Sequence, residues 1–201
     1  MEEIIAPISK EILKAELSED KRLRFTNKSH NEIYVITHQD SPNVMKEIGR
    51  LREIAFRAAG GGTGKAMDID EYDVMENPYK QLVVWNPEAE EILGGYRYLL
   101  GDEVQFDEHG KPLLATAHMF NFSEVFLKKY LPYTVELGRS FVTLEYQSTR
   151  AGSKGLFALR HAGQDRVHYL RRNKNGCCCI NRLIDTKIKC SAVLMNSVSA
   201  V

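Results

Sequence analysis

One short stretch concentrates the residues that could do acid–base chemistry. Residues 68–73 have the sequence Asp-Ile-Asp-Glu-Tyr-Asp. Four carboxylates in six residues repel one another unless cations or a positively charged ligand lie nearby. The chain offers Arg52, Arg97 and Arg139 at a distance, and Glu136 shortly precedes the last of them. We expect these groups to fold into one charged site. The alternative is a solvated acidic loop, because charge runs usually face water.

A glycine-rich segment leads into the acidic stretch. Residues 60–65 (Gly-Gly-Gly-Thr-Gly-Lys) approach the phosphate-loop pattern, but Ala59 and Ala66 stand where that pattern has glycine and Ser/Thr. The segment also follows a predicted helix, whereas a phosphate loop follows a strand. We therefore interpret it as a mobile flap and not as a nucleotide site.

A second glycine-rich segment, residues 150–155, is a better anion cradle, with the sequence Arg-Ala-Gly-Ser-Lys-Gly. It follows a long predicted strand, and backbone N–H groups of such a turn at a helix N-terminus can bind a phosphodiester or pyrophosphate. Arg150 and Lys154 add positive charge there. The histidines, in contrast, have no spacing that indicates a metal site, and we expect no metal.

The elements that must position these residues alternate between strand and helix patterns. Helical spacing predicts helices over residues 8–17, 44–59 and, after a Ser123 cap, 123–130. Runs of β-branched and aromatic residues predict strands over residues 32–37, 79–85, 92–100 and 134–146. Gly138 inside the last strand indicates a bulge or a close backbone approach. This order predicts a mixed α/β (α+β) domain with a largely antiparallel sheet flanked by helices.

The composition is typical of a globular protein. The chain has 201 residues, 43% hydrophobic and 27% charged, which suits one globular domain with a substantial core. No apolar run approaches the roughly 20 residues of a membrane span, and the acidic N-terminus lacks the features of a signal peptide. We therefore expect a cytoplasmic protein with no nucleic-acid partner.

The composition changes near residue 160. Residues 160–201 hold 8 basic and 2 acidic residues and all four cysteines, whereas residues 1–159 hold 19 basic and 25 acidic ones. Three adjacent cysteines, 177–179, lack paired CxxC spacing, which favours neither a zinc site nor a disulfide framework. We predict a domain over residues 1–159, with its core at 30–159, and an atypical basic tail that packs poorly against it. The alternative is a divergent tail with a fold of its own.

Four charged motifs stand in a fixed order along the chain: Arg50-Leu51-Arg52-Glu53-Ile54-Ala55-Phe56, Asp68-x-Asp70-x-x-Asp73, Gly94-Gly95-Tyr96-Arg97 and Val135-Glu136-Leu137-Gly138-Arg139-Ser140-Phe141. In this order they resemble the motifs of the acyl-homoserine-lactone synthases. The stretch from Lys46 to Leu159 is more similar still to the hemolysin-like branch of ornithine and glycine N-acyltransferases, which take acyl chains from acyl carrier protein. Both groups have the GNAT fold. The resemblance covers about residues 30–159, so a sheet of this family would be incomplete at its C-terminal end. The long flap and Gly138 favour the lipid-forming branch over autoinducer synthesis from S-adenosylmethionine.

The resemblance implies roles for individual residues. The implied catalytic residues are Glu136, Arg139 and Asp70. The implied substrate-binding residues are Arg52, Asp68, Asp73 and Arg97. The implied acyl-donor-binding residues are Arg150, Gly152, Lys154 and Gly155. A carboxylate such as Glu136 would take a proton from the acceptor's ammonium, directly or through a water, and an arginine would grip the acceptor's carboxylate. Backbone N–H groups would stabilise the oxyanion, so no nucleophilic side chain is required.

The sequence therefore predicts an N-acyltransferase. It would move a fatty acyl group from an acyl carrier protein or CoA thioester to the amine of an amino acid such as glycine or ornithine, giving an acyl-amino-acid lipid. No tightly bound cofactor is expected. The expected partners are the amino acid and acyl carrier protein, whose acidic surface suits basic residues such as Lys128 and Lys129, and peripheral contact with a membrane stays open. The alternative is a catalytically silent or truncated GNAT-like binding protein.

Overall fold

The computed structural model describes residues 1–26 and 30–147 of the chain. The chain divides into two compact units. Within the described residues, the first unit comprises 1–26, 30–98 and 137–147, and the second comprises 99–136. The basic tail predicted from residue 160, and its packing, lie outside the described residues.

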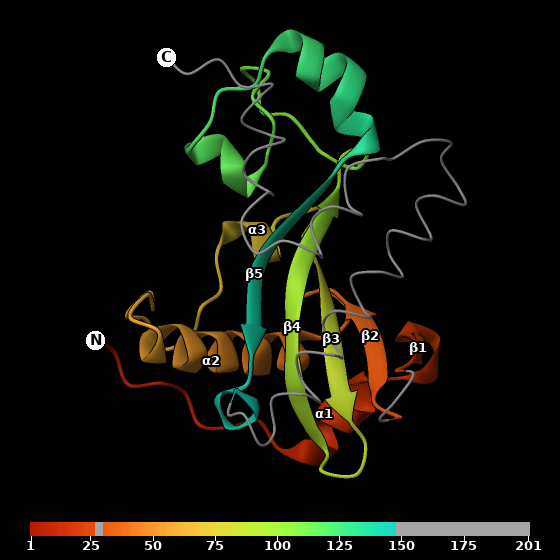
Figure 1. Cartoon of the computed structure of the whole chain (residues 1–201), viewed down its shortest axis with the longest axis vertical. Coiled ribbons are helices and arrows are strands. Elements are labelled where there is room, and N and C mark those ends of the chain that lie inside the picture. Colours follow the sequence, from red (N-terminus) through yellow and green to blue (C-terminus); the bar gives the residue numbers. More distant parts are fainter. Residues whose placement is uncertain (27–29, 148–201) are drawn as a thin grey trace. The chain divides into compact units, whose positions relative to one another are not determined.

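A five-stranded sheet with the order β1-β2-β3-β4-β5 organises the chain (Figure 1). The strands are β1 Arg22–Phe25, β2 Glu32–Ile36, β3 Lys80–Asn86, β4 Glu91–Leu100 and β5 Val135–Val142. The first four pair antiparallel with their neighbours. β5 runs antiparallel beside β4, and the Thr143 N–H that follows it donates to the Leu93 carbonyl at 2.9 Å. The predicted α+β class with an antiparallel sheet is confirmed.

Two helices cover one face of this sheet. The helices of the first unit are α1 Lys10–Glu16, α2 Pro42–Ala58 and α3 Glu71–Val74, with a 3-10 turn at Glu19–Lys21. Figure 1 shows α2 running across the strands, and its apolar stripe packs on β2, β3, β4 and β5 together with α1. The shared core consists of Leu13, Leu17, Tyr34, Ile36, Val44, Met45, Ile48, Leu51, Ala55, Val83, Trp85, Ile92 and Phe141.

Local sequence explains where α2 begins and ends. Pro42 occupies its first turn, where the missing N–H costs no hydrogen bond and the fixed φ suits a helix. Gly60 lies just beyond the C-terminal end with φ at 80°, a left-handed conformation that glycine adopts without steric cost. The chain therefore turns sharply from α2 into the glycine-rich segment.

The structure differs from the predicted elements at three places. β1 was not predicted, because its four residues alternate basic and exposed apolar side chains and carry no core pattern. The acidic stretch forms the short helix α3. The last strand ends at Val142, before the predicted limit of residue 146, because Leu144–Tyr146 forms a 3-10 turn.

The second unit consists of turns and short helices within the described residues 99–136. Its elements are the 3-10 turns Ala115–His118 and Leu131–Tyr133 and the π-helical turn Phe126–Tyr130. The predicted Ser123 cap is confirmed, since its hydroxyl accepts the Phe126 N–H at 3.2 Å. Across the described part of the chain, every helix is too short or too polar to cross a membrane.

Candidate functional site

Six charged residues meet in the first unit, and we call them the Arg–Asp cluster. They are Arg52 from α2, Asp68 and Asp70 from the segment before α3, Asp73 from α3, Arg97 from β4 and Arg139 from β5. Three guanidinium groups face three carboxylates, so the formal charge of the cluster is zero. The repulsion expected within the acidic stretch is thereby relieved, and the alternative of a solvated loop does not hold for these three aspartates.

The short helix α3 explains how the acidic stretch turns its carboxylates inward. Asp70 is the N-cap, and its carboxylate accepts the Tyr72 N–H at 3.1 Å. Asp73 closes a capping box by accepting the Asp70 N–H at 3.2 Å. Capping fixes both side chains at one end of the helix, whereas Glu71 between them stays exposed.

At the interior end of the Arg–Asp cluster both oxygens of Asp73 accept hydrogen bonds, although the buried Arg52 Nε has no partner. Arg52 lies on the buried face of α2, four residues after Ile48, and its side chain is 0% exposed. Its guanidinium donates to Asp73 at 3.3 Å and to the side-chain oxygen of Gln81. The Gln81 amide in turn donates to Asp73 at 2.9 Å. Burial lowers the pKa of Arg52, and the charge of Asp73 opposes that shift.

Arg97 joins the interior end to the rest of the cluster. Antiparallel pairing places it opposite Gln81, and its Nη1 lies 2.6 Å from Asp70 and 3.2 Å from Asp73. The guanidinium also lies 4.9 Å from the ring centre of Tyr79. Burial alone would lower the pKa of Arg97, but the hydrogen bond to Asp70 and the charge of Asp73 raise it well above its ordinary value. This guanidinium is permanently charged.

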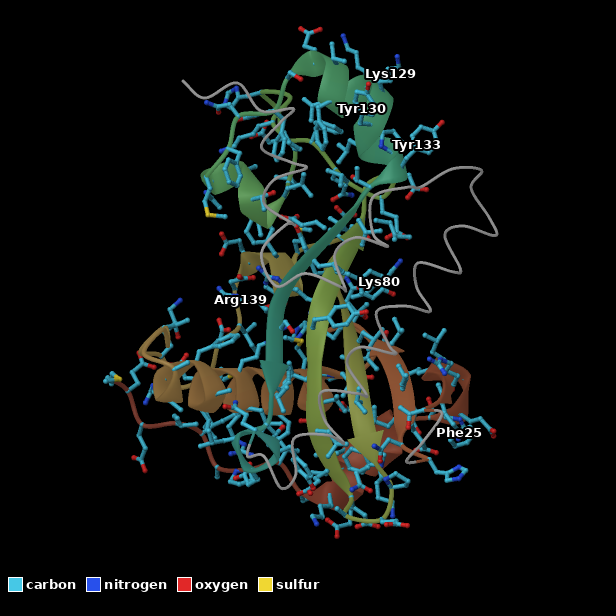
Figure 2. The ribbon with its side chains drawn as sticks, viewed as in Figure 1. Phe25, Lys80, Lys129, Tyr130, Tyr133 and Arg139 are labelled. Atoms are coloured by element: carbon cyan, nitrogen blue, oxygen red, sulfur yellow. The ribbon has the colours of Figure 1, made fainter. Side chains whose placement is uncertain are left out.

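Arg139 forms the outer end of the cluster, on β5 (Figure 2). Its side chain is 33% exposed, and its Nη2 lies 3.3 Å from Asp70 and 3.5 Å from Asp68. A non-glycine residue in a left-handed conformation is uncommon, and Arg139 has φ at 50°. The irregularity predicted at Gly138 therefore occurs one residue later. Strained residues of this kind concentrate at functional sites.

Asp70 and Asp68 differ sharply in their partners. Burial would raise the pKa of Asp70, but hydrogen bonds from Arg97 and Arg139 hold it below its ordinary value. Asp68 is only 2% exposed, and its Oδ2 atom has no hydrogen-bond partner. Burial raises the pKa of Asp68, although the charges of Arg139 and Arg52 oppose that shift. The cluster therefore contains one buried carboxylate oxygen without a hydrogen-bond partner.

Glu136, predicted as a catalytic base, belongs to the second unit. Its carboxylate accepts the Thr116 N–H at 2.9 Å within that unit. Its catalytic role stays a prediction. The predicted acyl-donor residues Arg150, Gly152, Lys154 and Gly155 lie outside the described residues. Within residues 1–26 and 30–147, no three His, Cys, Asp or Glu side chains are grouped so that they could hold a metal ion.

The glycine-rich segment is held in place by a residue that the sequence analysis missed. Glu53, 0% exposed, accepts hydrogen bonds from Thr63 N at 3.0 Å, Thr63 Oγ1 at 2.6 Å, Gly64 N at 2.8 Å and Arg57 Nε at 2.7 Å. Burial opposes ionisation, yet the hydrogen bonds from Thr63 and Arg57 lower the pKa of Glu53 to about 2. A Cβ on Gly62 would lie 2.4 Å from Arg57 Cγ. The segment expected to be a mobile flap is thus anchored to α2.

Gln81 is the second residue that sequence analysis missed, and here a signal existed. It is a polar residue at the start of the apolar run Leu-Val-Val-Trp on β3, and it is 1% exposed. A buried amide inside a strand requires hydrogen-bond partners. The position of Gln81 in an apolar strand could therefore have indicated that it bonds to a buried arginine of the predicted site.

Comparison with known proteins identifies the family. A family model described as "Acetyltransferase (GNAT) domain" matches residues 51–154, just over half of the chain. The chain therefore belongs to the GNAT acetyltransferase-domain family. The GNAT membership expected from the four motifs is confirmed, and the matched stretch contains the whole Arg–Asp cluster.

Two curated relatives have very similar sequences. A protein of Phocaeicola vulgatus named glycine N(alpha)-acyltransferase is 98% identical over 159 residues, which is 79% of this chain and 49% of that protein. A protein of Bacteroides thetaiotaomicron with the same name is 80% identical over 159 residues, 79% of this chain and 47% of that protein. The chain spans about half the length of these relatives. No solved structure shows a significant match.

Proposed function

We propose that this chain is an N-acyltransferase that transfers a fatty acyl group from a thioester to the α-amine of an amino acid, with glycine as the first choice of acceptor. The observation that carries the proposal is the 98% identity over 159 residues to a protein named glycine N(alpha)-acyltransferase. Membership of the GNAT family supports the reaction class. Residues 1–159 are proposed to form the acyltransferase domain.

The Arg–Asp cluster supports an amino acid as the acceptor. An amino acid carries an ammonium and a carboxylate on neighbouring atoms, so its site needs opposite charges close together. Arg139 and Asp68 provide such a pair at the outer end of the cluster, 3.5 Å apart. A partly exposed guanidinium can bind a carboxylate through two parallel hydrogen bonds, and a carboxylate can accept from an ammonium.

The acyl donor is proposed to be a thioester of acyl carrier protein or of CoA. Arg150, Gly152, Lys154 and Gly155 remain the predicted cradle for its phosphate-bearing arm. The product would be an N-acyl amino acid, a lipid, in keeping with the hemolysin-like branch of the family. The proposed location is the cytoplasm, and no tightly bound cofactor is needed for the reaction. Glu136 stays the sequence-predicted candidate for the base.

The experiment is a transfer assay with the purified full chain. Isotope-labelled glycine is incubated with a long-chain acyl thioester of CoA or, separately, of acyl carrier protein, and both N-acylglycine and free thiol are quantified by mass spectrometry. We expect labelled N-acylglycine to form in a one-to-one ratio with thiol. Thiol without amide, or no reaction with either donor, would contradict the proposal. Ornithine in place of glycine tests the acceptor, and Glu136→Gln tests the predicted base.

The second candidate is a silent binding protein that uses the Arg–Asp cluster to hold an amino acid. Such a protein would bind glycine without transferring an acyl group to it. Calorimetry with glycine alone separates the two candidates. Glycine binding together with no N-acylglycine would favour the silent protein.

A further inference from the structure

One carboxylate of the Arg–Asp cluster has a different environment from the other two. Asp70 Oδ1 accepts from Arg97 and from the Tyr72 N–H, and its Oδ2 accepts from Arg139. Both oxygens of Asp73 are bound as well, by Arg52 and by further donors. Every oxygen of these two carboxylates already has at least one donor within the cluster, which suits them as counter-charges.

Asp68 is buried, and only one of its two carboxylate oxygens has a partner. Its Oδ1 lies 3.5 Å from Arg139, which is the longest ion pair of the cluster, and its Oδ2 has no hydrogen-bond partner. Leaving a buried carboxylate oxygen without a donor is costly, and such atoms are rare in folded proteins. The backbone holds the residue firmly, because the Asp68 N–H donates to the Gly49 carbonyl at 2.9 Å. A donor supplied by a ligand would satisfy the open oxygen.

The residue of the cluster that contacts Asp68 and is also partly exposed is Arg139. Arg139 is the most exposed residue of the cluster, with 33% of its side chain accessible, and it contacts both Asp68 and Asp70. Its guanidinium is also the cluster's least constrained one, since both its contacts are longer than the 2.6 Å bond between Arg97 and Asp70. A carboxylate that binds Arg139 would bring a neighbouring ammonium close to Asp68.

We propose that Asp68 holds the ammonium group of the acceptor amino acid and removes its first proton, which makes Asp68 a catalytic residue of the transfer. This inference rests on the proposed function. In this proposal Asp68 takes the role of base that the sequence analysis assigned to Glu136, whose carboxylate accepts the Thr116 N–H within the second unit.

The proton and electron balance is complete with the two substrates. Asp68 Oδ2 takes one proton from the ammonium and leaves a neutral amine with a free lone pair. That lone pair forms the C–N bond to the thioester carbonyl, and collapse of the tetrahedral intermediate breaks the C–S bond. The electron pair of that bond leaves with sulfur, which takes the second proton of the nitrogen and departs as a thiol. Asp68 then releases its proton to water.

The charges around Asp68 are consistent with this role. The groups that face it are Arg139 from β5, Arg52 from α2 and the neighbouring Asp70 and Asp73. Burial raises the pKa of Asp68, which strengthens it as a proton acceptor, while the charges of Arg139 and Arg52 oppose that shift. The pKa of Asp70, in contrast, is lowered by its hydrogen bonds from Arg97 and Arg139.

The test compares Asp68→Asn with the wild-type chain in two measurements. The first is the affinity for glycine and for glycolate, which replaces the ammonium by a hydroxyl. We expect Asp68→Asn to weaken glycine binding about tenfold or more, because a charge-assisted hydrogen bond is lost, and to leave glycolate binding unchanged. The second is single-turnover transfer to glycine, which should fall about 100-fold or more. Glu71→Gln removes an exposed charge from the same segment and should change neither measurement.

The outcomes separate this inference from the proposed function. If the wild-type chain makes no N-acylglycine, the proposed function fails, and glycine binding alone decides the role of Asp68. Unchanged glycine affinity in Asp68→Asn, or an equal loss of glycine and glycolate binding, overturns the inference. So does Asp68→Asn transfer within threefold of wild type, and a 100-fold loss in Glu136→Gln would return the base to that residue. If Asp68→Asn does not fold, Asp68→Glu serves instead. It should keep the preference for glycine and lose about tenfold in transfer, and a loss of that preference counts against the inference.

Discussion

The two ends of the Arg–Asp cluster use the same residue types for different purposes. At the interior end, Arg52 and Asp73 are 0% and 1% exposed, and Gln81 supplies the remaining hydrogen bonds between them. At the outer end, Arg139 is partly exposed and Asp68 keeps one oxygen without a partner. Buried polar groups with all their hydrogen bonds made help to specify a structure, whereas a buried carboxylate oxygen without a partner can accept from a ligand. Among the three carboxylates of the cluster, the number of hydrogen bonds already accepted separates Asp70 and Asp73 from Asp68, the one proposed to bind substrate.

The largest loss of stability is expected from a substitution at the interior end of the cluster. Arg52→Met removes a fully buried guanidinium and leaves Asp73 with less counter-charge, so we expect the free energy of unfolding to fall by about 3–5 kcal/mol. Urea denaturation followed by circular dichroism measures this. Lys14→Met, at the exposed ion pair with Glu90, is the matched control and should leave the free energy of unfolding nearly unchanged. Equal effects of the two substitutions would show that the interior end does not hold the fold.

A second prediction concerns Glu53, a buried carboxylate on α2 that accepts four hydrogen bonds. Glu53→Gln weakens the charge-assisted hydrogen bonds to the glycine-rich segment and should cost about 2 kcal/mol of unfolding free energy at neutral pH. The pKa of Glu53 is lowered from 4.5 to about 2 in the folded protein. Its stabilisation is therefore complete above the ordinary value of 4.5 and is lost as pH falls from 4.5 towards 2.

Acid denaturation of wild type and Glu53→Gln measures that pH dependence. The stability difference between the two chains should shrink across this window as Glu53 becomes protonated. The exposed Glu88→Gln serves as the control and should follow the wild-type curve. A difference that stays constant down to pH 2 would mean that Glu53 does not act through its charge.

The smallest effect on stability is expected at the outer end. Arg139→Gln removes a partly exposed guanidinium whose ion pairs are 3.3 and 3.5 Å long, so unfolding should change by less than about 1 kcal/mol. Glycine and glycolate binding should both weaken about tenfold, because Arg139 is proposed to hold the carboxylate that they share. A large loss of stability with unchanged ligand binding would place Arg139 with the interior end.

Much of this arrangement follows from the sequence, and the exceptions have physical causes. Strands β2 to β5 and helix α2 were predicted because their hydrophobic patterns are clear, and the cluster residues were predicted from four ordered motifs. The internal division of the cluster was not predictable, because it depends on Gln81 lying opposite Arg97 in the sheet. The anchoring role of Glu53 also depends on tertiary contacts, since its partners Thr63 and Gly64 lie beyond the end of the helix.

The most direct test of the division between the two ends is a carbon NMR titration of the aspartate carboxylates in the full chain. The signal lost in Asp68→Asn should titrate above the ordinary aspartate value, because burial is only partly offset by Arg139 and Arg52. The signal lost in Asp70→Asn should titrate below it, because Arg97 and Arg139 both donate to that carboxylate. The account is contradicted if the pKa of Asp68 lies at or below the ordinary aspartate value, or if the two aspartates titrate together. Asp68 would then not differ from the fully partnered Asp70 in its environment.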